Sequence, residues 1–190
     1  MIRSKAIFLV FLISTLTVTP CAATDAPKEE TLQVTEIANS YELSVPISRL
    51  LMTIPKGSLL PKQNTVGGST DSPRYFYFED KRRALIASGW FESSREYSTF
   101  NQNWNDEKNS WRSRNFPVPI NEKFFKLGGW EAVAYDMPLP TGGNSHIRAH
   151  WVQAGTWIDL HLSLTSETSS SGSREKLLEL LKSIQVKQRP

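Results

Sequence analysis

Apolar and polar residues alternate along most of the chain after residue 40, and alternation with a period of two is typical of β-strands. Tyr41-Glu42-Leu43-Ser44-Val45 is the first such segment, and an apolar run at 50–54 follows before Pro55. Similar segments, separated by turn residues, lie at 75–78, 85–91, 123–127, 130–137, 146–153 and 156–164. The pattern predicts an antiparallel sheet of six to nine strands.

Two segments instead have the period of a helix. On one face of residues 95–111 lie Tyr97, Phe100, Trp104 and Trp111. Ser93 and Glu96 fit a capping box at the start of this helix. On one face of residues 174–184 lie Leu177, Leu180, Leu181 and Ile184. Amphipathic helices of this length are stable only when their apolar face is buried, so both are expected to pack on the sheet in an α+β fold.

Two-residue turns and long loops connect these elements. Gly128-Gly129 predicts a hairpin that pairs Lys126 with Glu131, and Ala154-Gly155 predicts a second hairpin. Loops rich in proline and glycine are expected at 56–73 and 138–145. A loop as long as the one at 56–73 is often functional.

Residues 1–23 have the three parts of a secretory signal peptide, namely a basic start, an apolar run at 6–13 and small residues that end at Ala23. The apolar run is shorter than the roughly 20 residues that span a bilayer. We expect cleavage after Ala22 or Ala23 and a periplasmic protein of a Gram-negative cell. An uncleaved membrane anchor is the alternative.

Cys21, the single cysteine, is the one residue through which a lipid could attach. Lipoprotein signals place a small residue before the lipidated cysteine, whereas Pro20 stands here, so we expect no lipid; lipidation at Cys21 is the alternative and the only expected link to a membrane. Cleavage after Ala23 leaves no cysteine for a disulfide, so stability has to come from the core.

Charge excludes one class of partner. Removal of the signal takes away Arg3 and Lys5 and no acidic residue, so the net charge falls from +3 to +1. The field of such a chain is weak, and we expect no nucleic-acid partner. The remainder is expected to comprise a flexible leader at 24–40, with a short strand at 31–37, a single domain at 41–187 and a tail at 188–190.

All three histidines lie in the hairpin around Ala154-Gly155. A two-residue turn there sets His150 opposite Asp159 and Arg148 opposite His161 on one face of the sheet. Trp157 lies on the same face and is the best candidate for an exposed tryptophan. These five residues are the candidate binding site.

Three interpretations of this patch remain open. It could be a ladder of polar side chains that solvates the sheet, or a surface that binds a partner or ligand. It could also be a catalytic or metal site in which Asp159 orients His150 as a general base, or in which a further ligand completes a metal site. His146 and His150 are about 13 Å apart along the strand, too far to share an ion easily. We expect no catalytic residue, metal or cofactor.

Familiar catalytic and nucleotide-binding motifs are missing, including Gly-x-Ser-x-Gly, His-Glu-x-x-His and Gly-x-Gly-x-x-Gly. The order of elements over about residues 40–187 resembles the PsbP/DcrB-like superfamily. The resemblance rests on the layout, on the opening segment that ends at Leu51-Met52-Thr53-Ile54-Pro55 and on the closing segment Leu180-Leu181-Lys182-Ser183-Ile184. It implies a small exported α/β/α sandwich with a partner-binding role and assigns no site residue.

The leading hypothesis is therefore a non-catalytic periplasmic accessory or binding protein that acts through a protein partner. An immunity protein against an exported toxin is one form of it. The competing hypothesis is a hydrolase or metal-binding protein that uses the patch of Arg148, His150, Asp159 and His161.

Overall fold

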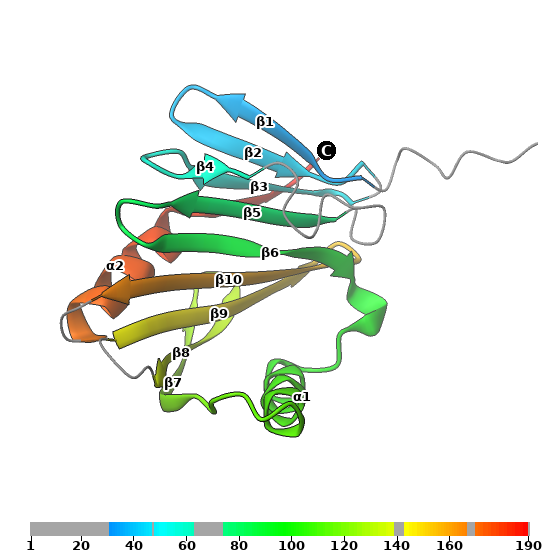
Figure 1. Ribbon diagram of the computed structural model, residues 1–190. Helices are drawn as coiled ribbons and strands as arrows, with labels where there is room; N and C mark the ends of the chain where they lie inside the picture. The colour runs from blue at the N-terminus through cyan, green and yellow to red at the C-terminus, as the bar shows by residue number, and fades with distance from the viewer. Residues whose placement is uncertain (1–30, 47, 63–73, 139–142, 167–169, 190) are drawn as a thin grey trace, which may run out of the picture.

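The computed structural model describes residues 31–46, 48–62, 74–138, 143–166 and 170–189 (Figure 1). Within these residues the strands form two antiparallel sheets, one of four strands and one of seven, together with two α-helices. The α+β class with antiparallel strands and two helices is confirmed. The strands are divided between two sheets, however, rather than gathered in one.

The four-stranded sheet has the order β1-β2-β3-β11. Its strands are β1 (Gln33–Ile37), β2 (Ser40–Ser44), β3 (Leu50–Pro55) and β11 (Gln185–Gln188). β1 is the short strand expected within the leader, so the domain begins before residue 41, and residues 24–30 lie outside the described part.

The tail prediction needs correction. Residue 188 was expected to lie beyond the domain, but Lys187 and Gln188 pair with β3, and the Arg189 amide donates to the Arg49 carbonyl at 2.6 Å. The half-buried Val186 packs against the core, which holds this last segment on the sheet.

The seven-stranded sheet has the order β4-β5-β6-β10-β9-β8-β7. Its strands are β4 (Leu60–Pro61), β5 (Tyr75–Asp80), β6 (Leu85–Ser93), β7 (Ile120–Leu127), β8 (Trp130–Pro138), β9 (Gly143–Gln153) and β10 (Thr156–Ser166). Most of the loop expected at 56–73 and the centre of that at 138–145 lie outside the described residues.

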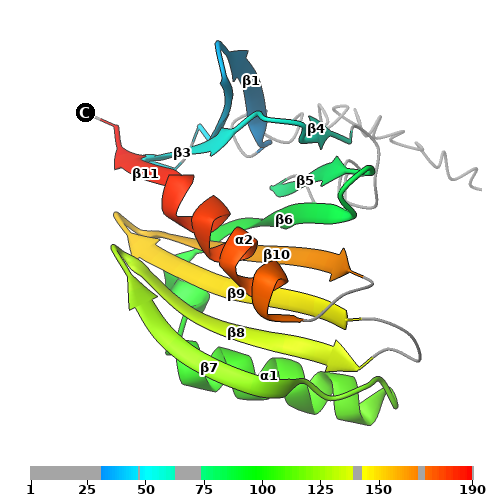
Figure 2. The same ribbon diagram turned by 90° about the vertical axis from the view of Figure 1, so that its left-hand side faces the viewer.

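The two helices cover opposite faces of the seven-stranded sheet, as the two views together show (Figures 1 and 2). α2 (Ser170–Ser183) contacts β9, β10 and β3 and buries Leu177 and Leu181 in the main core. α1 (Phe100–Ser113) buries Phe100 and Trp104 against Val133 and Tyr135 of β8. Among the described helices, none has the length and apolar character needed to cross a membrane.

α1 begins later than the capping box predicted. The Ser93 hydroxyl accepts a hydrogen bond from the Arg95 amide at 3.3 Å, but it caps only a 3₁₀ turn at Ser94–Glu96. Tyr97 is extended, with ψ of 125°, and its ring packs against His150 of the sheet. This contact holds the chain away from the helical path, and the α-helix starts only after Thr99, whose hydroxyl accepts from the Gln102 amide at 3.2 Å.

We expect Thr99→Ala to lower the free energy of unfolding by about 1 kcal/mol, because an uncapped helix start leaves an amide without an acceptor. Ser93→Ala is the matched control and should cost less, since it caps a single 3₁₀ turn. Urea unfolding of both variants measures the difference. A larger loss for Ser93→Ala would mean that the helix starts where the capping box placed it.

Candidate functional site

The Ala154-Gly155 turn gives β9 and β10 the predicted register. Ala154 and Gly155 have φ of 50° and 78°, the left-handed conformation that a two-residue type I′ turn requires at both positions. His150 lies opposite Asp159, and Arg148 lies opposite His161. The structure thus brings the predicted polar residues together on one face of the sheet.

Arg148 is the centre of this patch. Its Nη2 lies 2.7 Å from Oδ2 of Asp159, and its Nε lies 3.5 Å from Oε2 of Glu107 in α1. On the other side of Asp159, Oδ1 lies 3.3 Å from Nε2 of His150. We call Glu107, Arg148, His150 and Asp159 the buried ion network.

Glu107 was missed by the sequence analysis, although the sequence contains a signal for it. Glu107 follows Phe100 by seven residues and Trp104 by three, so it lies on the apolar face of α1. A carboxylate on the packed face of a helix needs a buried partner, and Arg148 of the facing sheet is that partner.

The network is enclosed rather than solvent-facing. His150 is 4 % exposed and Asp159 is 7 % exposed. The rings of Tyr97, Phe100 and Trp157 surround the imidazole of His150, with centroids at 5.6, 4.8 and 5.1 Å. Trp157 is therefore half-buried between Tyr97 and His150 and is not the exposed aromatic platform that the sequence suggested.

Arg148 stabilises the charge of Asp159 more effectively than that of Glu107. Burial alone would raise the pKa of Asp159, but Arg148 and His150 hold that pKa below its usual value. Burial raises the pKa of Glu107, and Arg148 only partly opposes this. Asp159 is thus a permanent counter-ion for Arg148 at neutral pH, and it does not carry protons.

A second pair of side chains extends the patch. Nδ1 of His146 lies 2.9 Å from Nε2 of His161, and the two rings are stacked. The ring of His146 also stacks on Tyr135 at 4.9 Å. Burial lowers the pKa of His146 to about 4 and that of His161 well below its usual value, so both are neutral at pH 7.

Neither arrangement brings three metal-ligating side chains together. Among the residues that the structure describes, no group of three His, Cys, Asp or Glu side chains could hold a metal ion. The sequence correctly kept His146 apart from His150 but did not pair His146 with His161, which are diagonal neighbours because His146 lies opposite Ser163.

Several buried polar atoms in α1 and on the adjoining face of the sheet have no hydrogen-bond partner of good geometry in the described protein. They are Asn103 Nδ2, His146 Nε2, Arg148 Nε, His150 Nδ1, Trp157 Nε1 and Asp159 Oδ1. Arg148 Nε and Asp159 Oδ1 still face Glu107 and His150 at 3.5 and 3.3 Å, whereas each of the other groups opposes folding by about 1–3 kcal/mol. The aromatic contacts of α1 must outweigh this cost for the helix to stay on the sheet.

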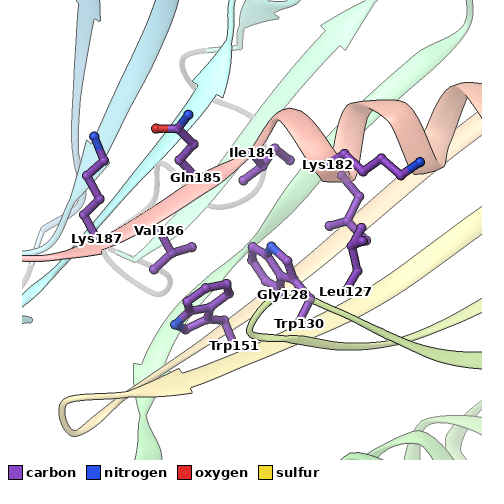
Figure 3. Close-up of a pocket in the computed structure, with 10 residues that line it drawn as sticks. Leu127, Gly128, Trp130, Trp151, Lys182, Ile184, Gln185, Val186 and Lys187 are labelled. Atoms are coloured by element: carbon purple, nitrogen blue, oxygen red, sulfur yellow. The ribbon is translucent and has the colours of Figure 1, made fainter.

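An open groove lies on the other side of the sheet, where the β7–β8 turn and β9 face the junction of α2 and β11 (Figure 3). Its volume is about 400 Å³. We call it the tryptophan groove, and it is lined by Leu127, Gly128, Trp130, Trp151, Leu181, Lys182, Ile184, Gln185, Val186 and Lys187.

Two tryptophans form its wall. Trp130 is 2 % exposed, and its indole N–H has no hydrogen-bond partner in the described protein. Trp151 packs edge-on against it at 5.3 Å, and its own indole N–H donates to Gln153 at 3.0 Å. The Trp151 ring lies so close to the turn that a Cβ on Gly129 would stand 2.5 Å from it, so only glycine fits there.

The rim of the groove is cationic. Lys182 and Lys187 are exposed, and neither forms an ion pair with any described residue. This site was not predicted from the sequence, which placed Lys187 at the end of the domain. Only the pairing of β11 with β3 brings the C-terminal segment to the β7–β8 turn.

The two sites differ in access. The buried ion network is covered by α1, whereas the tryptophan groove is open and combines apolar walls with two lysines. No known protein-family model matches the chain, and no match was found among curated proteins.

Proposed function

We propose that this protein is a non-catalytic accessory or binding protein, exported to the periplasm, that holds a protein partner in the tryptophan groove. One observation carries the proposal: an open apolar groove of about 400 Å³ is rimmed by two lysines without a described counter-ion. Apolar pockets with a few polar groups at fixed places are typical binding sites. An immunity protein that neutralises an exported toxin is one form of this function.

The proposal includes a relationship to the PsbP/DcrB-like superfamily. Two helices on opposite faces of an antiparallel sheet support it (Figure 2). The partner-binding role that the resemblance implies agrees with a groove that has no catalytic group in its wall.

The competing hypothesis, a hydrolase or metal-binding protein, has less support. A general base must reach the proton it removes. Nδ1 of His150 is buried, and aromatic rings surround it, so a substrate would reach it only after α1 had moved. The opposite nitrogen of His150 faces Asp159.

Gentle purification of the tagged protein from the periplasm, followed by mass spectrometry, tests the proposal. We expect a stoichiometric protein partner with wild type and a loss of roughly 30-fold in its affinity with Trp151→Ala, the typical effect of removing a central interface tryptophan. Trp90→Ala is the matched control because Trp90 is a half-buried tryptophan on the opposite face of the sheet. Recovery of no partner, or equal losses with both variants, would contradict the proposal.

A further inference from the structure

The outer edge of β11 offers free main-chain groups. Residues along an antiparallel strand alternate between pairs that bond to the partner strand and residues whose N–H and C=O point the other way. The Arg189 amide donates to the carbonyl of Arg49, so the main-chain N–H and C=O of Arg189 face β3. Because the orientation alternates along the strand, the main-chain groups of Lys187 and Gln185 face β3 as well. The N–H and C=O groups of Val186 and Gln188 therefore point away from β3, where no described strand pairs with them.

The tryptophan groove runs along this edge. Val186 lines the groove with its side chain, and Figure 3 shows Val186 and Ile184 on one side with Trp130 and Trp151 facing them. A chain laid beside β11 would find main-chain partners at Val186 and an apolar pocket for alternate side chains.

The charges beside the groove indicate which kind of segment would bind along β11. Lys182 and Lys187 lie beside the apolar wall, Lys187 with its ammonium on the opposite side of β11 from Val186 (Figure 3), and neither forms an ion pair with a described residue. An acidic side chain on the bound segment would complete these cations. Four residues of β11 span about 13 Å, which an extended segment of four to six residues would cover.

We propose that the partner supplies an extended acidic segment that adds to the four-stranded sheet as a new strand along β11, with its alternate apolar side chains in the tryptophan groove. This inference rests on the proposed function and specifies the occupant of the same site. Strand addition explains why a free sheet edge and an apolar pocket lie side by side. A fatty acid would fill the pocket but would leave the main-chain groups of Val186 unused.

A phage-displayed library of random dodecapeptides, panned on the full protein, tests the inference. We expect selected peptides in which apolar residues alternate with Asp or Glu. A synthetic peptide of the selected sequence should bind roughly fivefold more weakly to Val186→Pro, because proline removes the outward N–H and that bond contributes about 1 kcal/mol. Val186→Thr keeps the N–H and the branched shape and is the matched control.

Proline is tolerated on an edge strand where its nitrogen faces outward, so Val186→Pro should keep its fold, which circular dichroism checks. The peptide supplies a second test that needs no variant protein. Methylation of its backbone nitrogens at one set of alternate residues should abolish binding, whereas methylation at the other set should not. Lys182→Glu combined with Lys187→Glu should weaken binding of the acidic peptide.

The outcomes separate this inference from the proposed function. Peptides that lose binding with Trp151→Ala but not with Val186→Pro would overturn strand addition and leave the groove as a binding site. Strand addition would also be overturned if the selected peptides were basic or if no peptide were enriched. It would be overturned as well if the groove bound a fatty acid such as laurate and no peptide. A co-purified partner that is insensitive to Trp151→Ala would overturn the proposed function itself.

Discussion

Arg148→Met should lower the free energy of unfolding by about 3–5 kcal/mol, the usual cost of removing one member of a buried ion pair. Methionine keeps the length of the side chain but removes the cation between Asp159 and Glu107. Asp159 would then be an uncompensated buried carboxylate with only His150 beside it. Urea unfolding followed by tryptophan fluorescence measures the loss.

Two further variants show whether the loss comes from the network. Arg174→Met removes an ion pair of the same length, 2.7 Å, with Asp136. Asp136 keeps Asn121 and Ser145 as hydrogen-bond donors, so this control should cost less. Arg148→Met combined with Asp159→Asn should cost at least about 1 kcal/mol less than the sum of the two single changes, because the residues are coupled. A loss below about 1 kcal/mol for Arg148→Met alone would refute the view that the buried ion network stabilises the fold.

Acid should destabilise the protein between pH 6.5 and pH 4. The pKa of His146 is about 4 in the folded protein, whereas a histidine in the unfolded chain binds its proton near pH 6.5. Between these values the unfolded chain binds more protons, so stability is complete above pH 6.5 and falls as the pH approaches 4. The loss from His146 is roughly 3 kcal/mol. His161, whose pKa is also lowered by burial, adds to it.

Glu107 acts in the opposite direction. Its pKa is raised by burial, so the folded protein takes up this proton more readily than the unfolded chain as the pH falls. The measured loss is therefore smaller than the histidines alone would give. Unfolding free energies across this pH range measure it, and the double variant His146→Leu and His161→Leu should flatten the dependence. Titration of either imidazole near pH 6.5, observed by NMR of the folded protein, would show this account to be wrong.

The sequence predicted local pairing well because two patterns agreed. In β9 and β10 the polar residues coincide on one face and the apolar residues on the other, so a single register satisfied both, and the structure has it. The pairing of Lys126 with Glu131 across the Gly128-Gly129 turn was predicted in the same way and is confirmed. Both predictions depended on a turn of two residues.

The packing of elements that are far apart in the sequence could not be predicted from the sequence. Whether the polar patch is exposed depends on where α1 packs on the sheet. The helix begins only at Phe100 because Tyr97 is extended, and contacts with His150 and Trp157 hold Tyr97 in place. The tryptophan groove requires β11 to pair with β3, more than a hundred residues earlier in the chain. The alternation of four residues at 185–188 is too short to predict that pairing.

Whether the partner binds in the tryptophan groove is tested most directly by comparing this groove with the buried ion network in one binding measurement. The affinity of the co-purified partner should be determined for the folded forms of wild type, Trp151→Ala and His150→Ala. We expect a loss of roughly 30-fold with Trp151→Ala and little change with His150→Ala, whose side chain is buried against Phe100 of α1. Loss of binding with folded His150→Ala and unchanged binding with Trp151→Ala would contradict it and place the function at the polar patch.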